Sequence, residues 1–239
     1  RMAERKPRGF EAVQTWIFDL DNTLYPAECD LFAQVSARMS RFVADLLSLP
    51  IAEAKAVQKR YYHEHGTTLA GLMTHHGVDP GPFLDYVHDI DYAPVSPAPE
   101  LVRAIAALPG EKLIFTNGSR RHALRVTDRL GITQLFSGTF DIVDAGFVPK
   151  PHADAYHRFL TQHGVRPERA AMFEDLPQNL EAPAALGMTT VLVRTPLTDH
   201  PNLIEAQAWT ALPDHIHHET GALAAFLEGL APATSAAKP

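Results

Sequence analysis

The chain has 239 residues, of which 46% are hydrophobic and 21% are charged, and its formal net charge is −7. This length and composition allow one large domain or a core domain with a smaller insert. No basic stripe or arginine-rich run appears, which argues against nucleic acid as a partner. Cys29 is the only cysteine, so an intramolecular disulfide and a cysteine-based zinc site are both excluded.

The chain shows neither a signal-peptide pattern at its start nor an apolar stretch long enough to span a bilayer. We therefore expect a cytoplasmic protein that has no membrane partner. Residues 1–9 and 231–239 are expected to be flexible termini, because the last segment consists mainly of small residues and proline. The sequence leaves open whether the chain forms a homodimer.

The first predicted element is a buried strand at 14–18, and a long helical segment follows it. From about Cys29 to Asp89 there is no convincing strand, only helical periodicity. An apolar stripe from Leu31 to Leu47 predicts the first helix, and further helices are predicted at 52–65, 69–75 and 82–89. The proline-rich residues 94–99 are expected to form the hinge that leads out of this segment.

The rest of the chain alternates apolar runs with helical patterns. Buried strands are predicted at 112–116, 170–173 and 189–193, with a weaker one at 140–143, and helices at 121–130, 153–164, 180–186 and about 221–230. This alternation predicts a Rossmann-like α/β fold of three layers, in which helices cover both faces of a parallel sheet. We expect an α/β core at 10–26 and 94–230 with an inserted helical cap at 27–93, which would hang over the carboxyl ends of the strands as a lid.

Two carboxylates follow the first strand directly. Asp19 and Asp21 are two positions apart and therefore share a face of an extended backbone, and Thr23 follows two positions later. Like charges so close together resist joint ionisation. A divalent cation or a phosphate-handling site would resolve that conflict.

Three further polar motifs lie at or after the ends of later elements. They are Thr116-Asn117-Gly118, Lys150 between two prolines, and Glu174-Asp175. The hydroxyl and amides of the first motif suit phosphate oxygens, and the lysine supplies a cation. Each motif alone has a structural explanation as a turn, a surface lysine or a helix start. Their succession at strand ends favours one functional site.

In this order the four motifs resemble those of the haloacid dehalogenase superfamily of phosphotransferases, from roughly Trp16 to Arg194. The helical segment resembles that superfamily's first-position cap. The resemblance implies Mg2+ held by Asp19, Asp175 and the backbone carbonyl of Asp21, with Glu174 either a direct ligand or a neighbour of one. Asp19 would be the nucleophile that forms an aspartyl-phosphate, and Asp21 the acid and base.

The resemblance also assigns the phosphate-binding groups. Lys150 would supply a second cation, and the expected phosphate contacts are Thr23, Thr116, Asn117 and Gly118. Within the superfamily, two-haloacid dehalogenases lack the second acid of the first motif. The presence of Asp21 therefore favours phosphate esters over carbon–halogen bonds.

Residues 60–72 look like the pyrimidine 5′-nucleotidase branch of this superfamily, as do residues 21–25 and Thr116-Asn117 followed by His122-Ala123. This likeness implies hydrolysis of nucleoside monophosphates such as UMP and CMP. Thr67 and Thr68 are candidate substrate contacts, and a threonine there would also cap a helix.

The sequence is also compatible with other functions. The same superfamily contains sugar-phosphate phosphatases and phosphomutases, which share the intermediate. A non-catalytic binding or regulatory module is the alternative of another class, although the intact set of acids and lysine argues against it. His75-His76 and the histidines of 215–218 resemble metal spacing, but we expect exposed turns there, without carboxylate partners for a metal.

Overall fold

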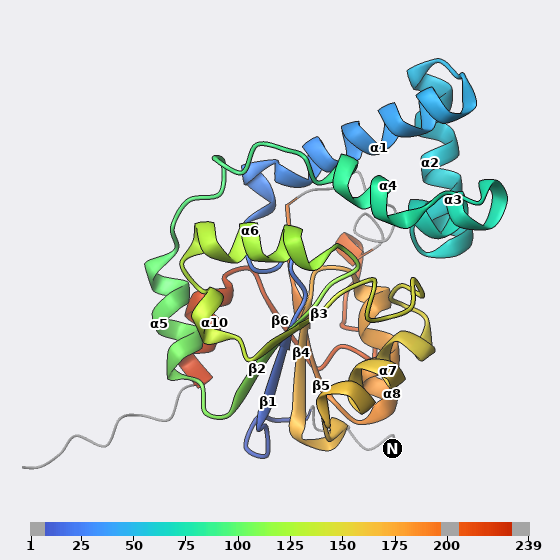
Figure 1. Cartoon of the computed structure of the whole chain (residues 1–239). Coiled ribbons are helices and arrows are strands. Elements are labelled where there is room, and N and C mark those ends of the chain that lie inside the picture. The colour runs from blue at the N-terminus through green and yellow to red at the C-terminus, as the bar shows by residue number, and fades with distance from the viewer. Residues whose placement is uncertain (1–7, 197–205, 231–239) are drawn as a thin grey trace, which may run out of the picture.

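The computed structural model describes residues 8–196 and 206–230 (Figure 1). Its described residues contain a six-stranded sheet, in the order β3-β2-β1-β4-β5-β6, and every neighbouring pair is parallel. The strands are β1 (Thr15–Phe18), β2 (Glu111–Phe115), β3 (Gly138–Phe140), β4 (Ala170–Glu174), β5 (Thr189–Val193) and β6 (His218–Thr220). The predicted Rossmann-like α/β core is confirmed.

Helices cover both faces of the sheet. Both faces are apolar, because successive side chains of the buried strands point to opposite sides. In β1, Trp16 and Phe18 belong to one apolar cluster and Ile17 to the other. The first cluster contains residues of α5 (Pro99–Ala107), α6 (Arg120–Leu130) and α10 (Leu223–Leu230). The second is closed by α7 (Ala153–His163) and by residues beside α8 (Glu181–Leu186), so the core has three layers (Figure 1).

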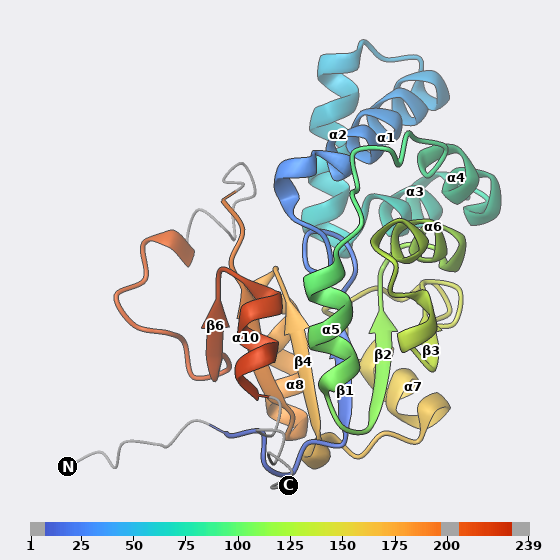
Figure 2. The ribbon, with the colours of Figure 1, turned by 90° about the vertical axis from the view of Figure 1, so that its left-hand side faces the viewer.

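Four helices lie between β1 and α5. They are α1 (Leu31–Leu47), α2 (Ile51–His65), α3 (Thr68–His76) and α4 (Pro80–Val87). They pack around an apolar cluster of their own, which includes Val43, Leu72 and Phe83. Figures 1 and 2 show these helices beyond the edge of the sheet at which the strand arrows end. We call α1–α4 the helical insert. Short 3-10 helices occur at Ala27–Cys29, Thr133–Leu135, Pro167–Arg169 and Pro177–Leu180.

The turn between α2 and α3 is fixed by local chemistry. Gly66 ends α2 with a φ of 86°, a left-handed conformation that glycine adopts without a steric penalty. The Thr67 hydroxyl then accepts a hydrogen bond of 3.0 Å from the Ala70 amide and caps α3, as the sequence predicts. A Cβ at Gly71 would lie 2.4 Å from Cβ of buried Tyr61, so only glycine lets the two helices approach this closely.

Two elements differ from the prediction. Residues 94–99 were expected to be a hinge, but Pro99 already begins α5, whose buried residues follow a helical spacing. Proline is favoured in the first turn of a helix, because its missing N–H has no partner to lose there. Strand β6 was not predicted. It pairs with β5 over three residues, which is too short for periodicity to detect.

The ends of the described chain are attached to the core. The Arg8 guanidinium donates hydrogen bonds of 2.8 Å to the carbonyl oxygens of Ala184 and Met188. Most of the expected flexible termini, residues 1–7 and 231–239, lie outside the described residues. Within the described ranges, none of the helices has the length and apolar character needed to cross a membrane.

Candidate active site

Three adjacent strands bring the predicted motifs to one edge of the sheet. Phe18 in β1 is in register with Ile114 in β2 and with Phe173 in β4. The Asp19 amide extends this pairing, because it donates a hydrogen bond of 2.9 Å to the Phe173 carbonyl. The residues after each strand therefore converge, as the parallel arrangement requires.

Lys150 connects these three strand ends. Its Nζ donates hydrogen bonds to Asp19 Oδ1 at 2.9 Å, to Glu174 Oε1 at 2.6 Å and to the Phe115 carbonyl at 2.8 Å. The side chain is 1% exposed. Burial by itself lowers the pKa of Lys150, but the negative charges of Asp19 and Glu174 outweigh it and raise the pKa. Lys150 is therefore a permanent buried cation.

The side chain of Asn117 holds the backbone of Lys150. Asn117 Oδ1 accepts a hydrogen bond of 2.8 Å from the Lys150 amide, and its Nδ2 donates one of 3.1 Å to the Lys150 carbonyl. This reciprocal pair fixes the loop that carries the lysine against the end of β2. The amide side chain thus has a positioning task that the sequence did not reveal.

Three buried carboxylates surround the lysine. One oxygen from each of Asp19, Glu174 and Asp175 lies within 4.8 Å of the other two. Burial, followed by the charge of Glu174, raises the pKa of Asp19 to about 7 in spite of Lys150. Burial, then Glu174 and Asp19, raise the pKa of Asp175 well above its usual range. One ammonium does not compensate three carboxylates, so the site has an excess of negative charge.

This donor set fits Mg2+. Carboxylate oxygens are the ligands that this ion prefers, and a divalent charge would balance the excess. Glu174 is already satisfied by protein groups: Oε1 accepts from Lys150 and from Asn179 Nδ2 at 2.9 Å, and Oε2 accepts from the Leu176 amide at 3.2 Å. Asp19 accepts two hydrogen bonds, from Lys150 Nζ at Oδ1 and from the Thr23 hydroxyl at Oδ2 at 3.3 Å. It therefore has more remaining capacity for an ion than Glu174. Asn179 orients Glu174.

Asp21 is held by two aromatic groups. Its Oδ1 accepts a hydrogen bond of 2.6 Å from the Tyr25 hydroxyl and lies 2.8 Å from His122 Nε2. Burial favours the neutral acid, but the charge of His122 and the hydrogen bonds from His122 and Tyr25 together lower the pKa of Asp21. The carboxylate is thus kept ionised and oriented.

His122 belongs to a buried network that the sequence did not predict. Its Nδ1 lies 2.8 Å from the Tyr92 hydroxyl, and its ring stacks on His88 with centroids 4.2 Å apart. Burial, followed by the charge of His122, lowers the pKa of His88 to about 3, so His88 is neutral at physiological pH. The only sequence signal was the spacing of His122 after Thr116, noted as part of a family resemblance.

The loop after β2 leads directly into the amino end of α6. Thr116 Oγ1 accepts a hydrogen bond of 2.9 Å from the Gly118 amide, and Ser119 caps α6 by accepting one of 3.2 Å from the His122 amide. The amino end of α6 favours negative charge. A Cβ at Gly118 would lie 3.3 Å from Thr116 Oγ1, which explains the small residue.

From the helical insert, the structure brings Tyr62 toward the acids. Its hydroxyl accepts a hydrogen bond of 3.3 Å from Gln178, and burial, then Asp175 and Glu174, raise its pKa. Thr68 is buried, and its hydroxyl donates to the Gln58 carbonyl in α2 at 3.3 Å. The hydroxyl of Thr67 caps α3. Both threonine hydroxyls therefore have partners inside the insert, and their contact with substrate stays a prediction.

Comparison with known proteins gives a consistent family. Residues 13–187 match the haloacid dehalogenase-like hydrolases. "Phosphate metabolism protein 8" of Saccharomyces cerevisiae is 27% identical over 76% of this chain, and "Enolase-phosphatase E1" of Frankia alni is 39% identical over 43% of it. The aligned regions span only 61% and 44% of these two relatives.

Solved structures share the fold. An L-2-haloacid dehalogenase from Xanthobacter autotrophicus has a TM-score of 0.53 and 16% identity, covering 90% of this chain and 97% of its own. YfnB from Bacillus subtilis, solved with bound magnesium, has a TM-score of 0.56 and 16% identity, covering 91% and 98%. At this level of identity the likeness concerns the fold.

Proposed function

The chain belongs to the haloacid dehalogenase-like hydrolases, and we propose from this premise that it is a Mg2+-dependent phosphomonoester hydrolase whose nucleophile is Asp19. The observation that carries the proposal is the second acid, Asp21, two positions after Asp19 and oriented there by Tyr25 and His122. Carbon–halogen cleavage needs no proton for the departing halide, whereas an ester oxygen does. The phosphatase named among the curated relatives supports the same choice.

The first step would be attack by a carboxylate oxygen of Asp19 on phosphorus. The bond from phosphorus to the ester oxygen breaks, an aspartyl-phosphate forms, and Asp21 gives its proton to the leaving oxygen. In the second step water attacks phosphorus, Asp21 takes the proton of that water, and the carboxylate of Asp19 is released. The two steps return both acids to their starting states.

The lowered pKa of Asp21 suits the second step directly, because an ionised carboxylate is a base. For the first step Asp21 must carry a proton while the substrate is bound. A phosphate dianion in the site raises the pKa of a neighbouring carboxyl, so substrate binding itself favours the protonated form. His122 and Tyr25 hold the same oxygen, which leaves the other oxygen of Asp21 for proton transfer.

Lys150 and the β2 loop would bind and orient the phosphate. All three Lys150 hydrogen bonds go to protein oxygens, so its contribution is its charge, which screens Asp19 from an anionic substrate. The Thr116 hydroxyl and the Asn117 amide would donate to phosphate oxygens at the start of α6. Asp19, Asp175 and the Asp21 carbonyl would hold Mg2+, which would neutralise charge and orient the phosphate when bound.

We propose nucleoside monophosphates, pyrimidine ones first, as the substrate class, with the helical insert acting as the cap. Support comes from the likeness of residues 60–72 to pyrimidine 5′-nucleotidases and from the half-buried Tyr62, whose hydroxyl lies near the acids. A sugar-phosphate phosphatase or a phosphomutase would use the same core. These differ in the leaving group or in the acceptor of the phosphoryl group, so substrate assays separate them.

The test is phosphate release with Mg2+ across nucleoside monophosphates, sugar phosphates and short-chain phosphate esters, with EDTA as the control. Release concentrated on UMP and CMP would support both the chemistry and the substrate class. Release directed to sugar phosphates would keep the mechanism and reject the nucleotidase assignment. If no ester released phosphate in a Mg2+-dependent manner, the proposed function would be wrong.

Metal removal and pH should act together on stability. The pKa of Asp19 is raised from 3.8 to about 7 in the ion-free fold. The neutral acid therefore stabilises the fold fully below about pH 4, and that contribution is lost as the pH rises through about 7. In EDTA, the melting temperature of the wild type should fall between pH 5 and pH 8 relative to Asp19→Asn, and saturating Mg2+ should reduce this fall. Parallel curves for the two proteins in EDTA would contradict the account.

His122 is expected to act by positioning Asp21. His122→Ala should lower kcat by about 10- to 100-fold with a smaller change in KM, because the carboxylate loses its orientation. The loss should be larger for alkyl phosphates than for p-nitrophenyl phosphate, whose leaving group needs little protonation. His122→Gln, which can place an N–H near the position of Nε2, should restore part of the rate. A uniform loss on both substrates without rescue would indicate a purely structural residue.

A further inference from the structure

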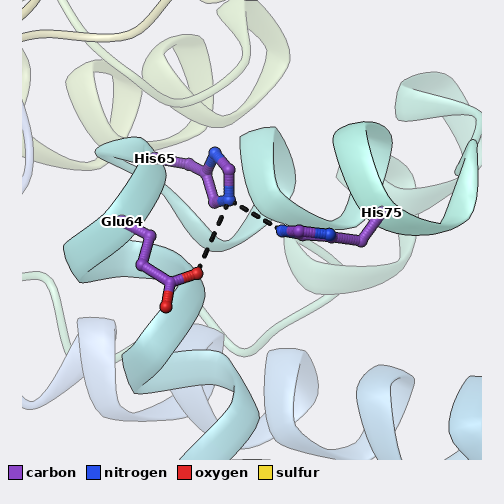
Figure 3. A group of neighbouring side chains, drawn as sticks. All are labelled: Glu64, His65 and His75. Atoms are coloured by element: carbon purple, nitrogen blue, oxygen red, sulfur yellow. Dashed lines mark hydrogen bonds and ion pairs between the residues drawn. The ribbon is translucent and has the colours of Figure 1, made fainter.

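The fold brings together three metal-binding side chains that are not part of the site above. From the sequence no metal was expected at His75, which was assigned to an exposed turn without a carboxylate partner. The turn between α2 and α3 changes this, since it places the end of α2 against the last turn of α3. Glu64 and His65 from α2 then face His75 from α3 (Figure 3).

The distances are close to those of a metal site. His65 Nε2 lies 2.9 Å from His75 Nε2 and 3.8 Å from Glu64 Oε2, and the three ligand atoms are all within 4.8 Å of one another. Two imidazole nitrogens bound to one tetrahedral Zn2+ at about 2.0–2.1 Å lie roughly 3.3 Å apart. Small side-chain movements would therefore complete the geometry without a change in the backbone.

The buried ring of Tyr61 packs against this cluster. Tyr61 stacks on the His75 imidazole, with centroids 4.9 Å apart and an interplanar angle of 18°. Its hydroxyl lies 2.7 Å from His76 Nε2, so His76 is held by a different partner. The close approach of Gly71 to Tyr61 fixes the spacing of the two helices. The two facing nitrogens are thus held by packing, which lowers the entropic cost of binding an ion.

We propose that Glu64, His65 and His75 form a second metal site, for Zn2+ or a similar transition ion. Two imidazoles and one carboxylate suit such an ion, whereas Mg2+ prefers the all-oxygen set around Asp19. Three protein ligands leave a position for water, and the exposed Glu64 and His75 give the ion direct access from solvent. The site does not depend on the proposed phosphatase activity.

An ion at this position would fasten α2 to α3 near the place where the insert meets the core. Gly66 follows His65, and a Cβ there would lie 3.2 Å from Pro149, next to Lys150 in sequence. The three ligands lie together only in the folded protein. Binding of the ion should therefore raise the melting temperature. It would stabilise the turn that carries Thr67 and Thr68.

The experiment uses tag-free, EDTA-treated full-length protein in excess Mg2+, so that the carboxylate cluster is occupied. Equilibrium dialysis against Zn2+ should give one retained ion per chain and a rise in melting temperature. His65→Gln and His75→Asn should each weaken Zn2+ binding by more than the roughly 10- to 100-fold that loss of an outer-shell partner of a ligand costs, because each removes a ligand. The matched control is His63→Asn, an exposed histidine on the same helix outside the cluster, which should bind Zn2+ as the wild type does.

Retention of no Zn2+ by the wild type, or equal retention by the wild type and the two histidine variants, would overturn the proposal. Circular dichroism checks that each variant folds. If His75→Asn unfolds through loss of its stacking on Tyr61, Glu64→Gln takes its place, because this exposed side chain can change without affecting the stack. Zn2+ retention and the melting temperature are both measured without a phosphate ester, which separates this proposal from the proposed function.

Discussion

Replacing Asp19 by asparagine is expected to abolish phosphate release while leaving the protein at least as stable as the wild type. The amide has the size of the carboxylate and can still accept the hydrogen bond from Lys150 Nζ. It is a far weaker nucleophile, so kcat should fall by at least about 10⁴-fold. The pKa of Asp19 near 7 shows that its charge is unfavourable in the ion-free fold, and removing that charge should not destabilise it.

The two readouts are phosphate release in Mg2+ and thermal unfolding in EDTA at pH 8. The matched control is Asp141→Asn, a buried carboxyl whose oxygens accept hydrogen bonds from the backbone amides of Arg120, Val143 and Asp144. The Asp141→Asn protein should be less stable than the wild type. The molecules that remain folded should release phosphate at the wild-type rate. Wild-type turnover by Asp19→Asn would show that another residue attacks phosphorus.

Lys150→Met is expected to remove both activity and stability. Its ammonium is the only lysine or arginine charge that the described residues place in ion-pair contact with Asp19 and Glu174. Removing one partner of a buried ion pair leaves the other charges uncompensated and costs about 3–5 kcal/mol in the free energy of unfolding. Loss of a cation that stabilises the reacting phosphate should lower kcat by about 10²–10³-fold.

Denaturant unfolding in EDTA and in Mg2+ measures the loss of stability. Mg2+ should restore part of the lost stability, because it compensates the same carboxylates. Lys55→Met, at an exposed position on α2, is the control and should change neither quantity. A Lys150→Met protein with wild-type stability in EDTA would mean that the charge of Lys150 is not needed to compensate the buried carboxylates.

The convergence of the acids was predictable from sequence, but the hydrogen-bond partners of each acid were not. Asp19 and Glu174 each lie at the end of an apolar run, and parallel strands must bring such ends to one edge. Periodicity does not show which oxygen already has a partner. The hydrogen bonds to Glu174 from Lys150 and Asn179 depend on rotamers and on loop positions that only the folded chain defines.

The two side-chain clusters that were not predicted from the sequence depend on contacts that form only in the folded chain. His122 meets Asp21 across 101 positions of sequence, and its imidazole could equally have been a surface group of α6. The cluster at the α2–α3 turn depends on how two helices cross, and the Gly66 conformation decides this. Helix α5 was missed for a local reason, because its first residue, Pro99, also ends a proline-rich stretch.

The central claim is that Asp19 forms a covalent bond with the transferred phosphoryl group. Its most direct test is rapid acid quenching of Asp21→Asn during reaction with 32P-labelled p-nitrophenyl phosphate, followed by peptide mapping. This variant keeps the nucleophile, and the good leaving group reduces the need for an acid, but the base for hydrolysis is lost. The account predicts label on the peptide that contains Asp19, and no label when Asp19 is also replaced by asparagine. Label on another residue, or turnover without any labelled peptide, would contradict it.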